Sequence, residues 1–188
     1  MVIDLESADI QQLLKDRRFS YLLSPVKVLV KKGLPRIEVG SIQIEELKER
    51  DLLEMPRWMA EVLSELGFIE IQEESFDIEL LRALSREKVQ SSSQLSTLRS
   101  DFYLRMKNYL NELRSYCEKD SSRRAEFDKI SILCRDLITI RVCKLLYNAC
   151  SSSLPAELLE KIPFEERVLL ERVHKIIEDW KKNILEVF

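Results

Sequence analysis

Few residues in this chain have the types and spacing that catalysis requires. Its only histidine, His174, lies in a segment rich in Leu and Lys, with no Ser, Cys or Asp motif beside it. The neighbouring carboxylates Glu45 and Glu46, and Glu73 and Glu74, cannot share a helix face, so neither pair indicates acid–base chemistry. With three glycines in the whole chain, a glycine-rich phosphate loop is excluded. The residues predict a protein that is not an enzyme and takes no cofactor.

The four cysteines do not have the spacing of a metal site. Cys117, Cys134, Cys143 and Cys150 contain no C-x-x-C pair, and a tetrahedral zinc site needs several Cys or His ligands at close range. All four fall in segments with helical periodicity. We interpret them as small apolar residues of a protein in a reducing environment, and we expect no metal.

Basic residues crowd the N-terminal region and could contact phosphate groups if they share a face. Asp16 and Glu38 dilute this cluster, and no aromatic residues are interleaved to stack on bases. The chain as a whole has a net charge of -3, whereas a duplex-binding domain is usually basic. Nucleic-acid binding is therefore the alternative prediction for the function of the chain. The same basic residues could instead form a solvated strand edge, where Lys side chains discourage aggregation. The cluster comprises Arg17, Arg18, Lys27, Lys31, Lys32 and Arg36.

The composition predicts a folded, well-solvated protein, because 45% of the residues are hydrophobic and 34% are charged. No uninterrupted run approaches the ~20 apolar residues that a membrane-spanning helix needs. No apolar segment follows a basic start, so we expect no signal peptide.

Residues 1–73 predict a small, β-rich α+β domain. A short helix is expected over residues 4–18, with Asp4 or Ser7 as its cap. Apolar residues then alternate with polar ones over 26–31, 37–39 and 42–44, which predicts one antiparallel meander of three short strands.

A helix is expected to cover this sheet, because strands this short bury little on their own. Pro56 suits its first position, Gly67 suits the position after its end, and residues 68–71 predict a returning strand. The predicted apolar face of the helix comprises Trp58, Met59, Val62, Leu63 and Leu66.

Residues 74–188 predict a helical bundle, so the fold class is mainly α with the small β-rich domain first. A polar, serine-rich loop is expected over 89–96. The predicted helices cover residues 76–88, 97–118, 127–150, 155–161 and 163–188. The last of them has a stripe suited to packing against another helix, formed by Leu169, Val173, Ile176, Trp180 and Ile184.

The helix over 127–150 is apolar nearly all round, a pattern typical of a buried central helix. Arg141 and Lys144 within it need acidic partners, since charges are seldom buried unpaired. Those partners lie in this chain or in another subunit, and we predict a subunit interface. Aromatic residues are enriched at interface centres, although each could instead belong to the core. The aromatic candidates for the interface are Trp58, Phe102, Tyr103, Tyr109 and Trp180.

Three segments resemble subunits of the GINS complex. Residues 53–61 (LEMPRWMAE) resemble the VPLWLA segment of the subunits that place a β-rich B domain before a helical A domain, with Met59 in place of the usual Leu. Residues 100–103 (SDFY) resemble the SPYYMEL start of the long A-domain helix. Residues 136–145 (DLITIRVCKL) resemble the D-x-R-x-x-K-L central helix. Length and domain order extend the resemblance to the whole chain and favour the archaeal B-first subunit.

The resemblance implies a non-catalytic scaffold of the replicative helicase in DNA replication. Its expected partners are an A-domain-first GINS subunit, in a heterotetramer with two copies of each chain, the MCM helicase and a RecJ-like or Cdc-type factor. Primase is a further candidate partner. DNA contact is expected to be weak or indirect, and membrane association is not expected. The implied location is the cytoplasm of an archaeon, or the nucleus if the source is eukaryotic.

Overall fold

The structure is a computed structural model that describes residues 10–39, 42–119 and 121–185. It divides into two compact units, one within Asp9–Glu74 and the other within Ser75–Phe188. The first unit holds a small three-stranded antiparallel sheet, and the second is a helical bundle. The predicted fold class, mainly α with a small β-rich region first, is confirmed.

The sheet of the N-terminal unit is centred on β1 (Pro25–Val30). This strand pairs antiparallel with β4 (Leu52–Pro56) on one side and with β5 (Ile69–Ile71) on the other. Val26, Val28 and Val30 are buried while Lys27 is exposed, so the predicted alternation is confirmed. Before the sheet comes α1 (Ile10–Leu23), which continues five residues past the predicted end at residue 18. The predicted caps of this helix, Asp4 and Ser7, lie outside the described residues.

The predicted three-stranded meander is wrong. β2 (Ile37–Val39) and β3 (Ile42–Ile44) pair only with each other, as a separate two-stranded sheet. An isolated bridge between Leu34 and Leu47 lies at the base of this hairpin. Both sides of β1 are occupied by the strands that flank the covering helix in sequence. The valine face of β1 can be buried only under that helix, so the strands connected to it pair with β1 in preference to the hairpin.

The covering helix, α2 (Arg57–Glu65), packs its Met59, Ala60 and Leu63 side chains on the sheet. The predicted face is thus partly wrong, because Val62 and Leu66 are exposed. Pro56 is the last residue of β4 and caps the helix from outside, one position earlier than predicted.

Gly67 ends α2 in the left-handed conformation, with φ at 75°. The Gly67 N–H donates to the Ser64 carbonyl at 2.9 Å, and the Phe68 N–H donates to the Leu63 carbonyl at 3.0 Å. This pair of bonds defines a Schellman motif, which lets the chain reverse into β5 while satisfying two carbonyls at the helix end.

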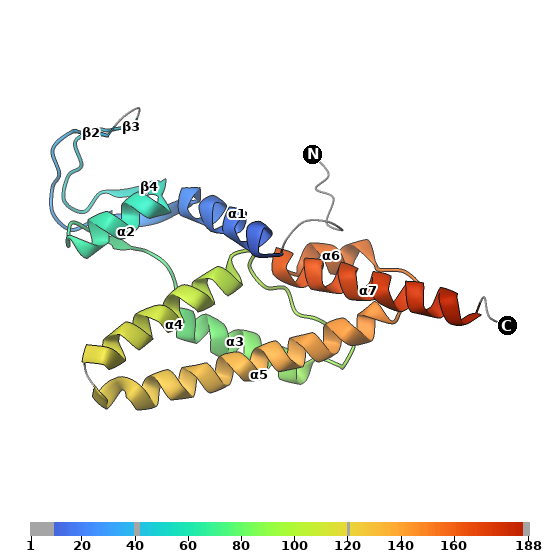
Figure 1. Ribbon diagram of the computed structural model, residues 1–188. Helices are drawn as coiled ribbons and strands as arrows, with labels where there is room; N and C mark the ends of the chain where they lie inside the picture. The colour runs from blue at the N-terminus through green and yellow to red at the C-terminus, as the bar shows by residue number, and fades with distance from the viewer. Residues whose placement is uncertain (1–9, 40–41, 120, 186–188) are drawn as a thin grey trace. The chain divides into compact units, whose positions relative to one another are not determined.

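The C-terminal unit is organised around α5 (Arg124–Ala149). Figure 1 shows α3 (Phe76–Val89) and α4 (Phe102–Lys119) beside it, and α7 (Phe164–Leu185) packed against it. A short 3-10 turn (Ser121–Arg123) joins α4 to α5, and α6 (Ala156–Lys161) precedes α7.

The start of α4 differs from the prediction by five residues. The helix begins at Phe102 rather than at residue 97, so the connection from α3 covers residues 90–101. Leu95, Ser96 and Leu98 of this connection are buried, although its sequence is polar and serine-rich. A connection that buries three side chains is part of the core rather than a loose loop.

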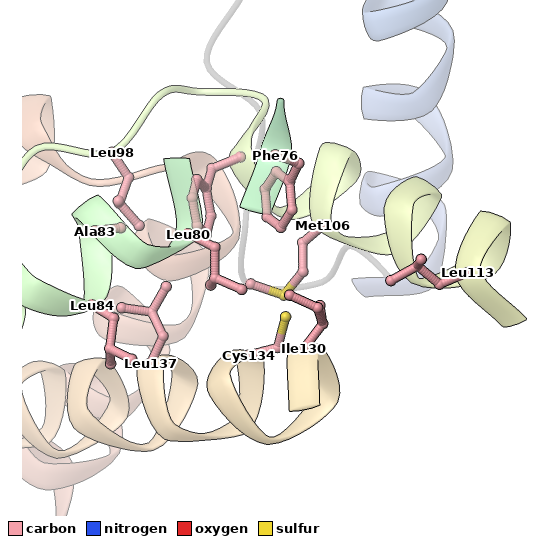
Figure 2. Close-up of a cluster of buried hydrophobic side chains, with 11 residues drawn as sticks. Phe76, Leu80, Ala83, Leu84, Leu98, Met106, Leu113, Ile130, Cys134 and Leu137 are labelled. Atoms are coloured by element: carbon pink, nitrogen blue, oxygen red, sulfur yellow. The ribbon is translucent and has the colours of Figure 1, made fainter. Parts of the chain in front are cut away.

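Two apolar clusters make up the core of the helical unit. Figure 2 shows the larger one, in which Leu80 and Leu84 of α3, Met106 of α4, and Cys134 and Leu137 of α5 point toward one another. The second cluster lies where α5 ends and α7 begins, and its members include Leu145, Ala149, Ile162 and Leu170. Burial in the first cluster raises the pKa of the Cys134 thiol to about 11, which keeps it protonated at neutral pH.

The prediction that α5 is buried all round is wrong. Its buried residues form one stripe, which runs from Ile130 through Leu137 and Arg141 to Ala149. Ile132, Leu146 and Tyr147 lie outside that stripe and are exposed. Among the described residues, the helices that contact α5 most are α3, α4 and α7. These three helices cover one side of α5 and leave its other side exposed.

Replacing Gly67 with Ala should destabilise the N-terminal unit by about 1 kcal/mol, because a Cβ is disfavoured at positive φ. No atom lies within 4 Å of the added Cβ, so the cost is conformational and not steric. Urea unfolding followed by Trp58 fluorescence measures the change. Gly33→Ala, which has no positive φ and meets only the Leu47 carbonyl oxygen at 3.4 Å, is the matched control. Equal stability of both variants would contradict the assignment.

Candidate functional site

Arg141 lies at the centre of the helical unit, where its side chain is completely buried. Its Nε and Nη2 atoms donate to the two carboxylate oxygens of Glu166 on α7, at 2.5 and 2.6 Å. Its Nη1 donates to the Glu87 carboxylate on α3 and, at 3.0 Å, to the Ser96 carbonyl oxygen in the connection 90–101. One guanidinium on α5 therefore binds three other segments of the unit.

Lys144 lies one turn further along α5 and also binds the Glu87 carboxylate. Its Nζ donates to Glu87 Oε2 at 2.8 Å and to the Glu87 carbonyl oxygen at 2.9 Å. Glu87 Oε1 also accepts from the backbone N–H of Ser96 at 2.9 Å and from its hydroxyl at 2.5 Å. The buried Glu87 carboxylate thus accepts hydrogen bonds from two cations and from the Ser96 turn.

Tyr103 connects α4 to this network, because its hydroxyl donates to the Glu166 carboxylate. Burial, followed by the charge of Glu166, raises the pKa of Tyr103, so the phenol stays a donor throughout the accessible pH range. We refer to Glu87, Tyr103, Arg141, Lys144 and Glu166 as the buried ion network.

The electrostatics of the network favour its fully charged state. Burial by itself opposes ionisation of Glu87, but the hydrogen bonds from Lys144 and Ser96 and the charge of Arg141 outweigh it, so the pKa of Glu87 is lowered. Burial likewise opposes the charge of Arg141, but the hydrogen bond and charge of Glu166 outweigh it, and its pKa is raised. Two cations meet two carboxylates, so the unit buries no net charge.

These contacts correct the prediction that Arg141 and Lys144 meet acidic residues of another subunit. Their acidic partners, Glu87 and Glu166, belong to this chain, and both cations are buried by it. Each ion in the buried ion network is bound to another ion of the same network. The chemical role of the network is therefore to hold α3, α4, α5 and α7 together.

A similar buried arginine occurs in the N-terminal unit. Arg57, at the start of α2, donates from Nη2 to Glu73 Oε1 at 2.6 Å, and its guanidinium lies 4.3 Å from the ring centroid of Tyr21 on α1. Burial opposes the charge of Arg57, but the bond to Glu73 outweighs it, and the pKa is raised. The pair links α1, α2 and the segment after β5.

The other interface candidates lie in different environments. Phe102 is fully buried, and Tyr109 and Tyr103 pack against the same cluster. Trp58 is half-buried against the sheet. Only Trp180 is exposed, at 62%. Four of the five aromatic candidates therefore serve the core, as the alternative interpretation of each allowed, and Trp180 remains a surface residue.

Acidic residues are interleaved with the predicted basic cluster. Lys31 pairs with Glu70 at 3.0 Å, and Arg36 pairs with Glu38 at 2.9 Å. Lys27 lies opposite Glu54 in the register of β1 and β4. Arg17 and Arg18 lie on α1, and Lys32 follows β1. The cluster is thus divided among several elements and partly neutralised.

His174 and the cysteines have ordinary structural environments. The Nδ1 atom of His174 lies 2.9 Å from the carbonyl oxygen of Ala149 at the end of α5. Cys134 is buried, Cys117 is half-buried, and Cys143 and Cys150 are exposed. In the described part of the chain, no group of three or more His, Cys, Asp or Glu side chains could hold a metal ion. Over the same residues, no helix is both long and apolar enough to cross a membrane.

Two exposed apolar surfaces lie on the helical unit. The first, which we call the α5 outer face, comprises Ile132, Thr139, Cys143, Leu146 and Tyr147 on the side of α5 opposite the buried stripe, where Arg135 and Asp136 are also exposed. The second, which we call the α7 stripe, comprises Leu169, Ile176, Trp180 and Ile184. The neighbouring side of α7, with Leu170, Val173 and Ile177, packs on the second core cluster. These surfaces are the candidate functional sites of the unit.

A scan of the sequence against protein-family models finds no match, and a search of the curated proteins finds no significant relative.

Sequence reasoning missed the acidic half of the buried ion network. Glu87 follows Leu80 and Leu84 at helical spacing, so it continues the buried stripe of α3 where an apolar residue would be expected. Glu166 lies in the first turn of α7, where a negative charge is favourable by itself, so its position gives no sign of a buried partner. A carboxylate on an apolar stripe, in a chain with cations on another apolar helix, is the signal that could have paired them.

Replacing Glu87 with Gln should destabilise the helical unit by about 3 kcal/mol, because Arg141 and Lys144 stay buried while one of their carboxylates is lost. Chemical unfolding followed by circular dichroism measures the change. Glu171→Gln removes the exposed partner of Arg167, at 2.8 Å, and should cost less than about 0.5 kcal/mol. A loss for Glu87→Gln as small as that of the control would show that the network contributes little.

The destabilisation caused by Glu87→Gln should disappear in acid. The pKa of Glu87 is lowered by folding, so its contribution is present above the unfolded value of about 4.3 and disappears as the pH falls through the folded value. The difference in unfolding free energy between the wild type and Glu87→Gln should therefore shrink below about pH 4. A difference that stays constant from neutral pH into acid would contradict the lowered pKa.

Proposed function

We propose that this chain is a non-catalytic subunit of a GINS complex, in which it scaffolds the replicative helicase. The observation that carries the proposal is the pair of exposed apolar surfaces on the helical unit, the α5 outer face and the α7 stripe. A chain in a four-chain assembly needs two separate contacts, one with its A-first partner and one that completes the tetramer.

The α5 outer face is the better candidate for the A-first partner. Ile132 and Leu146 lie on it with 56% and 44% of their surface exposed, and Tyr147 beside them is 61% exposed. Side chains of this size each contribute about 1.5–3 kcal/mol when fully buried. Large apolar side chains that are exposed on the outer side of a helix are typical of a bundle completed by another chain.

The buried ion network supports the scaffolding role in a second way. Charged hydrogen bonds constrain the direction as well as the distance between their partners, so the network restrains the helices that display the two surfaces. An assembly subunit that presents its contacts on restrained helices loses little conformational entropy on binding. The residues corresponding to the D-x-R-x-x-K-L segment therefore serve the interface indirectly, by positioning its helices.

The order of the two units is the order that the resemblance implies, with the small β-containing unit before the helical one. MCM, a RecJ-like or Cdc-type factor and primase remain the proposed wider partners. We propose no nucleic-acid function for the N-terminal unit, because Lys31 and Arg36 are engaged with carboxylates.

Purification of the tagged full-length chain from its own cells, with mass spectrometry of the bound proteins, tests the proposal. We expect an A-first GINS subunit and MCM to co-purify, in a complex whose mass by light scattering fits two copies of each GINS chain. Recovery of the chain alone, with no replication protein, would overturn the proposal.

Leu146→Glu should reduce capture of the A-first subunit by about tenfold or more, because it places a charge among the apolar side chains of the α5 outer face. Lys107→Glu, at an exposed position of α4, introduces the same residue elsewhere and should leave capture unchanged. Equal capture by both variants, with unaltered circular dichroism, would remove the α5 outer face from the interface.

A further inference from the structure

We infer that the ion pair between Arg57 and Glu73 fixes the length of the tether that joins the N-terminal unit to the helical unit. The tether is the stretch between the end of β5 and the start of α3, residues 72–75. With the pair formed, only Glu74 lies between the anchored exit from one unit and the capping residue of the other. This role does not depend on the proposed function, because each supporting contact lies within a single unit.

The exit from the N-terminal unit is held at two successive residues. The N–H of Gln72 donates to the Lys27 carbonyl oxygen at 2.8 Å, which continues the pairing of β5 with β1 by one residue. Glu73 Oε1 then accepts from Arg57 Nη2 at 2.6 Å. The chain is therefore attached to the unit for two residues beyond the end of β5.

The other end of the tether is held by α3. Ser75 is the N-cap of this helix, and its carbonyl oxygen accepts from the Glu79 N–H at 3.3 Å. Its hydroxyl donates to the Asp77 carboxylate. An extended residue spans at most about 3.3–3.6 Å, so the stretch from Glu73 to Ser75 spans at most about 7 Å. If Glu73 were released, the free stretch would start at Gln72 and could span about 11 Å.

Arg57 needs the Glu73 carboxylate more than an exposed cation would. Its side chain is only 5% exposed, and it is the first residue of α2, where the helix dipole disfavours a positive charge. Within the described part of the chain, its Nε atom is buried without a hydrogen-bond partner. Glu73 supplies an acceptor and the opposite charge that burial of the guanidinium demands, so the closed pair is strongly favoured.

The two members of the pair are not equally fixed. Arg57 is also held by its backbone N–H, which donates to the Ser24 carbonyl oxygen at 2.9 Å, and by its contact with the Tyr21 ring. Glu73 lies beyond the last strand, and 20% of its side chain is exposed. Loss of the pair should therefore move Glu73 rather than Arg57. Glu73 and Glu74 have further interactions within the chain, so this segment should loosen without detaching.

Nuclear magnetic resonance relaxation of the full-length chain tests the inference. Glu73→Gln removes the charge and keeps the size of the side chain. We expect the backbone order parameter of Glu74 to fall from about 0.85 to below about 0.6. Glu70→Gln, which removes the exposed partner of Lys31 from the neighbouring strand, is the matched control and should leave this order parameter unchanged.

An order parameter of Glu74 that is the same in Glu73→Gln and in the wild type would overturn the inference. A pair that only stabilised the folded unit would lower the free energy of unfolding and leave this native-state order unchanged. If Glu73→Gln does not fold, Glu73→Asp replaces it, since it keeps the charge and shortens the side chain by one methylene. A partial loss of order is then expected, and wild-type order in Glu73→Asp would be the contrary result.

The same relaxation data test the consequence for the tether. A longer flexible tether lets the two units that it joins reorient more independently. The ratio of their rotational correlation times should therefore change in Glu73→Gln and keep its wild-type value in Glu70→Gln. Loss of order at Glu74 with an unchanged ratio would show that the pair holds the segment without limiting the units, and would overturn the role assigned to the tether.

Discussion

The structure of the helical unit depends on the burial of one guanidinium. Moving an arginine out of water costs several kcal/mol, even after relaxation, unless its donors and its charge are matched. Arg141 is completely buried, and its matching groups come from α3, α7 and the connection 90–101. These segments must therefore converge on α5 in one arrangement. An apolar residue of similar volume could fill the space. It would restrict the orientation of the neighbouring helices far less than a bidentate pair does.

Charged residues lie on both sides of α5. The ions of the buried ion network use the inner side of α5 and the start of α7, so the inward stripe of α5 is partly charged. The outer side meanwhile exposes Ile132, Cys143, Leu146 and Tyr147 beside the charges of Arg135 and Asp136. Both sides of α5 therefore carry charged as well as apolar residues. Restrained helices that expose large apolar side chains are suited to assembly, as the proposed scaffold requires. The N-terminal unit has the same kind of internal anchor, since Arg57 holds Glu73 and contacts Tyr21.

Patterns along a single element were the most reliable guide to the fold. The valines of β1 alternate because one side of a strand is buried, and Gly67 ends α2 because a left-handed residue is needed there. Patterns that depend on a neighbour were less reliable. The meander was wrong because pairing is decided by which strands flank α2. The face of α2 was partly wrong because Val62 and Leu66 are as apolar as the residues that the sheet covers.

The sequence by itself determined the class of fold, the order of the two units, the approximate extent of most helices and the need of Arg141 and Lys144 for acidic partners. Only the tertiary structure decided where those partners are, since Glu87 and Glu166 lie far from Arg141 in sequence, and a place on a helix stripe does not show which other helix that stripe meets. It also decided that Phe102 belongs to the core and Trp180 to the surface. Periodicity describes one helix at a time, whereas burial depends on which neighbours arrive from elsewhere in the chain.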